Sequence, residues 1–349
     1  MPLASLQYLR GIAAFMVICV HLRTQVERMG YAGGWPDWTA AGVDIFFVLS
    51  GFLMWSTTVG RDQPPLEFYR RRIVRIVPLY WLLTSVVVAV MVVAPQALQS
   101  VRFDWLNVIG SYLFFFTPGS SGRLEPVLVV GWTLNYEMLF YVIYGAALAL
   151  PAGWRFGTTV GVIVALVCFG ATTWADADPV LQRYTASIMV EFALGMVIAR
   201  CWQRLPAGRA GTGLGVLLTV AGFAGLALLW DVPTPNWRGL SCGVPAAMIV
   251  TGALLLERAG SLPHLPGMQR LGDMSYSLYL SHPIVLSAFA QVWRKLGLHL
   301  LPGGWWLFCL AASAVCIAFA AVLYRWVESP LNRRLVARTG APMDRRANH

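Results

Sequence analysis

Residues 39–58 read TAAGVDIFFVLSGFLMWSTT, a run of twenty mostly apolar residues with one charged side chain, Asp44. The hydrocarbon core of a bilayer is about 30 Å thick, and a helix needs roughly 20 such residues to cross it. Comparable runs follow along the chain at 7–26, 73–94, 131–150, 156–174, 185–200, 213–230, 239–257, 274–293 and 304–327. The sequence therefore predicts an all-α bundle of about ten transmembrane helices.

The overall composition excludes most other classes of protein. Of the 349 residues, 58% are hydrophobic and 12% are charged, whereas a soluble domain carries roughly 25% charged residues. Disordered, coiled-coil and small disulfide-rich chains each need a compositional bias that is absent here. The six cysteines lack metal-like spacing, so we expect buried free thiols and no metal site. We predict one transmembrane domain over residues 1–330 and a basic cytoplasmic tail over 331–349.

The arginines indicate how the bundle is oriented. Of the 26 Lys and Arg residues, 17 lie in loops on the side of the N-terminus, 8 lie on the other side, and Arg10 begins the first span. Lys and Arg accumulate in cytoplasmic loops, so we expect both termini to be cytoplasmic. The formal charge of +10 then reflects membrane topology, and no nucleic-acid partner is expected.

Two shorter patterns describe packing. The stretch 106–117, LNVIGSYLFFFT, is apolar but too short to cross the bilayer, which predicts a re-entrant or interfacial helix with Phe114, Phe115 and Phe116 in lipid. Two GxxxG patterns, at 157–161 and 211–215, are typical of closely packed helices.

Ionisable residues inside predicted spans are the candidates for function, because each costs free energy there unless it faces a partner or a cavity. Arg10 and His21 lie eleven residues apart on the first span. At about 100° and 1.5 Å per residue, they share nearly one helix face about 16 Å apart. The alternative is a histidine that only satisfies a neighbouring helix.

Two acidic residues, Asp44 in the second span and Glu137 in the fourth, are predicted to lie in the outer half of the membrane, like His21. A carboxylate there could fix the tautomer of His21 and stabilise its protonated form. The alternatives are an Asp that favours its own helix N-terminus and a Glu within an interfacial aromatic belt.

Arg72 and Arg75, three residues apart at the start of the third span, share a face that enters the membrane from the cytoplasmic side. Guanidinium groups grip phosphates, whereas the neighbouring Arg70 and Arg71 suit lipid headgroups equally well. With Arg10 they form an inner layer of arginines beneath an outer His/Asp/Glu layer. Two such layers suit a donor with phosphates at one end and a reactive acyl group at the other.

Several ordered motifs carry a resemblance to a known family. They are LRGIAAFMVICVH (9–21), GVDIFFVLSGFLM (42–54), RRRIVRIVPLYW (70–81), GWTLNYEMLFY (131–141), LGDMSYSLYLSHPIV (271–285) and YRWVESP (324–330). Over residues 1–330 the chain resembles the acyltransferase 3 family of integral membrane acyltransferases, in particular its short exopolysaccharide-modifying O-acetyltransferases.

The resemblance implies transfer of an acyl group, commonly acetyl from acetyl-CoA, to a hydroxyl of a surface or secreted glycan. Acetyl-CoA would be a co-substrate, with no tightly bound cofactor. The acceptor would be a glycan or a lipid-linked oligosaccharide, handled at the bacterial cytoplasmic (inner) membrane beside polysaccharide synthesis machinery.

The resemblance also assigns roles to residues. His21 becomes the general base, oriented by Asp44 or Glu137, and Arg10, Arg72 and Arg75 bind the donor. His282 precedes Pro283, where it either joins the site or satisfies a backbone hydrogen bond that the proline breaks. Direct transfer and an acyl-histidine relay both fit these residues.

Two other classes of function remain compatible with the sequence. A transporter or flippase of a glycan lipid would also place ionisable groups along a path through the spans. A non-enzymatic scaffold for a polysaccharide synthesis complex would leave the pairing of Arg10 with His21 unexplained.

Overall fold

The computed structural model describes residues 3–61, 63–97, 103–119, 122–173, 178–231 and 237–338. Within these ranges the chain is helical and contains no strand. The long helices are α1 (Ala4–Glu27), α2 (Gly42–Thr58), α3 (Pro65–Val93), α5 (Trp132–Ala147), α6 (Ala152–Thr173), α8 (Val190–Cys201), α9 (Gly208–Leu229), α11 (Gly243–Arg258), α13 (Ser275–Lys295) and α14 (Gly304–Leu323). The all-α bundle predicted from the apolar runs is confirmed.

Shorter elements connect or extend these helices. They are α4 (Trp105–Leu113), α7 (Pro179–Tyr184), α10 (Arg238–Ser241), α12 (Pro266–Asp273) and α15 (Ser329–Arg338). Single 3₁₀ turns, η1 (Asp37–Ala41), η3 (Val129–Gly131) and η4 (Ser187–Met189), precede α2, α5 and α8, and a π-helical turn, η8 (Tyr324–Glu328), joins α14 to α15. The predicted domain boundary at residue 330 therefore falls inside α15, which packs against α3. Residues 339–349 of the predicted tail lie outside the described residues.

Eight helical stretches within the described residues are long and apolar enough to cross a membrane. The other two predicted spans, 131–150 and 274–293, coincide with α5 and α13. α5 has only 16 residues, and α13 carries serines, tyrosines and His282 among its buried side chains. α5 is thus shorter than any of the eight stretches, and the buried polar side chains of α13, which lower its hydropathy, face the interior of the bundle.

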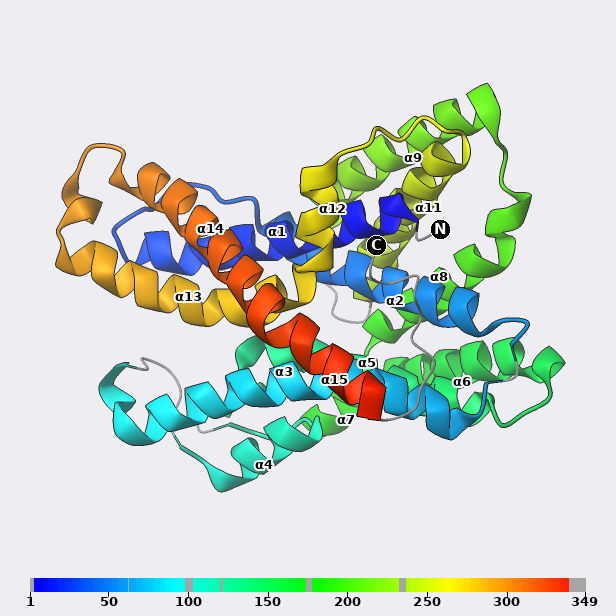
Figure 1. The fold of residues 1–349 in the computed structure, drawn as a ribbon, viewed down its shortest axis with the longest axis horizontal. Helices are drawn as coiled ribbons and strands as arrows, with labels where there is room; N and C mark the ends of the chain where they lie inside the picture. The colour runs from blue at the N-terminus through cyan, green and yellow to red at the C-terminus, as the bar shows by residue number, and fades with distance from the viewer. Residues whose placement is uncertain are drawn as a thin grey trace.

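α1 and α2 lie at the centre of the bundle. Their apolar stretches are 61% and 78% buried, whereas those of α6 and α9 are 17% buried and belong to the periphery. In Figure 1, α1 and α2 run between the α9–α11 pair at the top and α3 with α4 at the bottom. One core joins α1, α2 and α11, a second joins α1, α13 and α14, and a third joins α2, α3, α5 and α8. α1 therefore contacts α2, α11, α13 and α14, and its Val17 also belongs to the third core.

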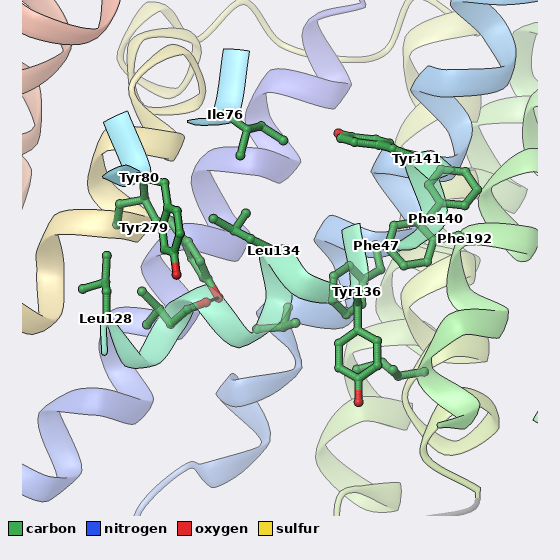
Figure 2. Close-up of a cluster of buried hydrophobic side chains, with 14 of the residues drawn as sticks. Phe47, Ile76, Tyr80, Leu128, Leu134, Tyr136, Phe140, Tyr141, Phe192 and Tyr279 are labelled. Carbon is green, nitrogen blue, oxygen red and sulfur yellow. Dashed lines mark hydrogen bonds between the residues drawn. The ribbon is translucent and has the colours of Figure 1, made fainter. Parts of the chain in front are cut away.

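The third core is rich in aromatic rings. Figure 2 shows Phe47, Tyr136, Phe140 and Phe192 gathered on one side of it. The rings of Phe140 and Phe192 stack with centroids 4.4 Å apart, which is favourable packing for aromatic pairs. This core fixes α5 against α2 and α8 and so determines which groups Glu137 can reach.

The short apolar stretch near residue 110 forms a helix as predicted, but its three phenylalanines do not share one environment. α4 ends at Phe114, whose φ of 61° is left-handed, and the chain turns back there. The ring of Phe114 packs on Tyr80, and Phe116 is buried between Tyr136 and Tyr184. Only Phe115 is exposed. The prediction that all three rings lie in lipid is therefore wrong, because the reversal at Phe114 turns two of them into the protein.

The N-terminus of α1 is held by a carboxylate from another helix. Glu257 of α11 accepts hydrogen bonds from the backbone N–H groups of Ala4 (2.8 Å) and Ser5 (3.1 Å) and from the Ser5 hydroxyl. These amides have no partner within their own helix, and negative charge is favourable at a helix N-terminus. Glu257 thereby fixes the axial position of α1, and with it the positions of Arg10 and His21.

The two GxxxG patterns have different outcomes. A Cβ at Gly215 would lie 3.0 Å from the Gly252 carbonyl oxygen of α11, so Gly215 serves close helix packing as predicted. A Cβ at Gly211 would lie 2.6 Å from the Pro206 carbonyl oxygen, which belongs to the loop just before α9 and not to a neighbouring helix. Gly157 and Gly161 are exposed, and a Cβ at either position meets no described atom within 4 Å. The predicted packing role of 157–161 is wrong, because α6 turns this face away from its neighbours.

The closest helix contact joins α2 and α8 at Gly51 and Gly195, where a Cβ at either residue would lie 2.0 Å from a carbonyl oxygen of the facing helix. Gly195→Ala must push the two helices apart, and overpacking of this kind costs about 1–3 kcal/mol. Gly161→Ala is the matched control, which should be neutral or up to about 1 kcal/mol stabilising, because alanine favours the helix. Thermal unfolding midpoints of the two purified variants check this; equal midpoints would contradict the close contact.

Candidate active site

The two ionisable residues of the first span lie on one unbroken helix. α1 carries Arg10 and His21 with no proline or kink between them, so they are separated by about 16 Å along the axis. Both side chains are partly buried. The face predicted from their spacing therefore exists, and the groups around each residue define two levels of the site.

The first level is a pair of histidines. The imidazole rings of His21 and His282, which lies on α13, meet edge to face with centroids 4.8 Å apart and an interplanar angle of 71°. Nδ1 of His21 lies 2.8 Å from the Val17 carbonyl oxygen, and Nδ1 of His282 lies 3.2 Å from the Leu278 carbonyl oxygen. A carbonyl oxygen only accepts, so Nδ1 is the donor in both rings. In the neutral tautomers this leaves both Nε2 atoms as bare bases.

His21 is therefore oriented by a backbone carbonyl group and not by the carboxylate that was expected. Val17 lies one helical turn before His21, and its carbonyl fixes the tautomer without any charged group. His282 is fully buried, and its Nε2 has no hydrogen-bond partner among the described residues. The two rings supply two bases that face each other in an apolar surrounding.

The second level is formed by three arginines, Arg10, Arg72 and Arg75, which we call the basic cluster. Arg10 and Arg72 each interact electrostatically with Arg75. The guanidinium of Arg72 also lies 5.8 Å from the centre of the Phe68 ring. The ion pairs formed within the described part of the chain involve other residues, so none of the three arginines has a carboxylate at salt-bridge distance.

Carboxylates lie near the basic cluster at longer range. Arg10 interacts electrostatically with Glu137, Glu328 and Asp273. Glu328, in the π-helical turn η8, accepts a hydrogen bond of 2.5 Å from the Ser277 hydroxyl. Burial raises the pKa of the Asp273 carboxyl, and the positive charge of Arg10 opposes that rise. The positive charge of the basic cluster is thus partly compensated by these carboxylates, which surround it at longer range.

Glu137 belongs to this second level. Ser50 donates a hydrogen bond of 3.2 Å to its carboxylate, the Tyr141 hydroxyl donates another, and both Arg10 and Arg72 act on it electrostatically. Glu137 was expected beside His21, and the structure corrects this. The physical reason is that α5 begins deep in the bundle, where the Val130 carbonyl accepts a hydrogen bond from Tyr279, so Glu137 lies seven residues further on.

α13 connects the two levels. Along this helix, Tyr276 donates to the Ile76 carbonyl (2.7 Å) next to Arg75, Ser277 donates to Glu328, and Tyr279 donates to the Val130 carbonyl (3.1 Å). Figure 2 shows Tyr279 close to Tyr80 at the edge of the aromatic core. His282 follows, about 9 Å of helix beyond Tyr276. One helix therefore positions the arginines relative to the histidine pair.

Asp44 does not join His21. It is fully buried, and Arg238 of α10 donates to both of its carboxylate oxygens, at 3.3 and 2.9 Å. Glu191 of α8, also fully buried, lies close enough to interact electrostatically with Asp44 and Arg238. A buried carboxylate requires a compensating charge, and Arg238 supplies it. The expected role of Asp44 in orienting His21 is therefore corrected to a role in an outer charge cluster of Asp44, Glu191 and Arg238.

Sequence reasoning missed Glu328, Glu191 and Arg238. The first two carry the same signal that identified Glu137, an acidic residue inside an apolar run, and Glu328 lies in the quoted YRWVESP motif. Arg238 was counted as a loop residue because its partner is 194 positions away. In the described parts of the chain, no group of three or more His, Cys, Asp and Glu side chains could hold a metal ion.

Comparison with known proteins supports the resemblance stated above. The model of an acyltransferase domain, that of the acyltransferase 3 family, matches residues 3–325. The chain is 39% identical to the exopolysaccharide production protein ExoZ of Rhizobium meliloti over 86% of this chain and 91% of that protein. It is 27% identical to nodulation protein 10 of Rhizobium leguminosarum, over 86% of this chain and 85% of that protein.

A third relative is longer. The chain is 27% identical to the peptidoglycan O-acetyltransferase OatA of Listeria monocytogenes, over 94% of this chain and 56% of OatA. No solved structure matches the chain. The match across nearly the whole helical bundle, together with the similarity to ExoZ, shows that this multi-pass membrane protein belongs to the acyltransferase 3 family and is an O-acyltransferase.

Proposed function

We propose that the protein transfers an acyl group, in the first place acetyl, from acyl-CoA to a sugar hydroxyl of a cell-surface polysaccharide or exopolysaccharide. The observation that carries this proposal is a cluster of three arginines that lack ion pairs, one of which, Arg10, lies on the same helix as the histidine base His21, about 16 Å before it. The names of ExoZ and OatA support the choice of a glycan acceptor and of acetyl.

The basic cluster fits the donor end of this reaction. A CoA thioester carries phosphates at one end and its acyl group at the tip of a long flexible arm. Guanidinium groups bind phosphate oxygens through paired, charge-assisted hydrogen bonds. Arg10, Arg72 and Arg75 would hold these phosphates, so that the arm extends along α1 toward the histidines.

His21 supplies the base. Its bare Nε2 takes the proton of the acceptor hydroxyl as the hydroxyl oxygen attacks the thioester carbonyl carbon. The C–S bond then breaks, and the leaving thiolate takes that proton from His21. In the acyl-histidine relay the same Nε2 would instead attack the thioester and carry the acyl group to the sugar.

The proposed setting is the bacterial cytoplasmic membrane, with both termini in the cytoplasm and the basic cluster open to cytoplasmic acyl-CoA. The acceptor is a glycan or a lipid-linked oligosaccharide, supplied by polysaccharide synthesis machinery. The excess of arginine in loops on the N-terminal side supports this orientation.

The orientation can be tested with reporter fusions. A fluorescent protein fused after residue 338 should fold and fluoresce in the cytoplasm, and alkaline phosphatase at the same position should be inactive. The matched fusions within the loop after α13, at residues 297–303, should behave in the opposite way. Active phosphatase after residue 338 would overturn the proposed orientation.

His21→Ala tests the base. Loss of a general base typically lowers the rate by about 10²–10⁴-fold, so release of free CoA from acetyl-CoA in the presence of a crude glycan fraction should fall by at least about 10²-fold. His264→Ala, at an exposed loop histidine, is the matched control and should retain wild-type release. Undiminished release by the purified, folded His21→Ala variant would exclude His21 as the base. Wild-type protein that moves a glycan lipid but releases no CoA would favour the transporter.

Arg72→Gln and Arg75→Gln test the donor site. Each variant loses charge-assisted hydrogen bonds to phosphate, which should raise the KM for acetyl-CoA by about 10- to 100-fold, with a smaller effect on kcat. Arg70→Gln, two residues before Arg72 and exposed, is the control for general loss of positive charge. A KM that rises equally in all three variants would indicate nonspecific electrostatics and not a phosphate site.

A further inference from the structure

The charge that forms on His21 during the proposed reaction has no carboxylate to stabilise it. Asp44 is bound by Arg238, and Glu137 interacts with Arg10 and Arg72. In the described part of the chain, the titratable side chain that touches the His21 ring is His282. A buried imidazolium without a partner is costly, so the surroundings of His282 decide whether it can share the charge.

The other titratable groups near His282 are neutral at physiological pH or lie further away. The Tyr279 ring is 6.0 Å from the ring of His282. Uncharged titratable side chains of the packed helices are Cys19 on α1, Tyr80 on α3, and Cys309 and Cys316 on α14. Charged groups on the same α1 are Arg23 and Glu27, two and six residues beyond His21, and Arg23 is paired with Glu27 and Asp37. On the approach from the basic cluster, Glu328 binds Ser277, five residues before His282, and Arg10 lies about 16 Å from His21. At the far end of α13, Arg294 and Lys295 lie twelve residues or more away.

One structural role for His282 uses only one of its two nitrogens. Pro283 lacks the N–H that would bind the Tyr279 carbonyl four residues earlier. Nδ1 of His282 lies 3.2 Å from the Leu278 carbonyl oxygen, and the ring also interacts with the Tyr279 backbone, so one nitrogen serves the backbone next to Pro283. This role leaves Nε2 unexplained, because Nε2 is buried without a partner, on a ring that lies against His21. A buried polar atom left unsatisfied in this way usually has a functional reason.

The tautomers of the two rings allow them to share one added proton. With both Nδ1 atoms donating to carbonyls, both Nε2 atoms are acceptors, and two acceptors cannot bond to each other. Addition of a single proton converts the pair into a donor and an acceptor. The two rings are in contact, with centroids 4.8 Å apart and planes crossed at 71°, so a proton bound by one ring has the other imidazole as its immediate neighbour.

We propose that His282 is a positioning residue that shares, through its Nε2, the proton that His21 takes from the acceptor hydroxyl. This inference rests on the proposed function. The hydroxyl O–H bond breaks, its proton binds Nε2 of His21 and is held between the two rings, and the oxygen forms the new ester bond. When the C–S bond breaks, the thiolate receives the same proton and the pair returns to its neutral state. No electron is transferred and no further reactant is required.

The test compares two variants of His282 with wild type. His282→Phe keeps a ring at this position but has no acceptor, and His282→Gln keeps an acceptor oxygen. We expect kcat for CoA release to fall by about tenfold or more in His282→Phe, to fall less in His282→Gln, and to leave the KM for acetyl-CoA unchanged. The acidic limb of the kcat profile should move to lower pH in His282→Phe, because the proton on His21 is then less stabilised. His264→Gln is the control.

Each result separates the two roles of His282. If the pH profiles of wild type and His282→Phe have the same shape after scaling, His282 is only structural and the inference is wrong. Equal activity of the Phe and Gln variants would overturn it as well. Should His282→Phe fail to fold, the pH profile of His282→Gln decides between the same outcomes.

A second measurement does not require activity. In protein labelled with ¹⁵N-histidine, the Nε2 resonance of His21 should titrate differently in wild type and in His282→Phe or His282→Gln, because the partner for the shared proton has changed. An unchanged titration would overturn the inference. Wild-type protein that releases no CoA yet shows this change would refute the proposed function while supporting the shared proton.

Discussion

The rest of the structure depends on one constraint, that a charge inside an apolar bundle must find a partner. Asp44 binds Arg238 across 194 residues of sequence, and Glu257 binds the N-terminal amides of α1. These contacts fix α2 and α1, the two central helices. Against this background, the three arginines of the basic cluster stand out, because among the described residues none of them has a carboxylate at salt-bridge distance. We therefore expect the reaction to take place where buried charges have no partner within the chain.

The parts of the fold that local sequence determines could be predicted. Apolar runs of about twenty residues located the helices, because a span must satisfy its backbone hydrogen bonds within itself. The shared face of Arg10 and His21 follows from helix geometry alone and holds in α1, which is unbroken. Similarity to the acyltransferase 3 family could be recognised from ordered motifs, each of which is a short continuous stretch of one helix or of two consecutive helical elements.

The predictions that were wrong depend on contacts between segments that are distant in sequence. Glu137 was placed at the level of His21 because its span was assumed to start at the membrane surface, whereas the turn η3 that precedes α5 already lies deep in the bundle, where Val130 accepts a hydrogen bond from Tyr279. Asp44 was assigned to His21 because nothing local distinguishes it from a carboxylate facing the site. On α2, Asp44 and Ser50 are six residues apart, so they face different neighbours, and Ser50 is the residue that reaches Glu137. No pattern within one helix reveals which neighbour each face meets.

Asp44 binds Arg238 and not His21, and this has a chemical consequence. A carboxylate beside an imidazole raises the pKa of the ring, and a ring that is already protonated has no lone pair at Nε2 with which to accept a proton from a hydroxyl. A backbone carbonyl fixes the tautomer of His21 and leaves the resting ring neutral. A second neutral imidazole adds no charge at rest, yet it can accept a hydrogen bond once the first is protonated. A pair of histidines thus stabilises the charge only when it forms, which is the property that a base buried in a membrane requires.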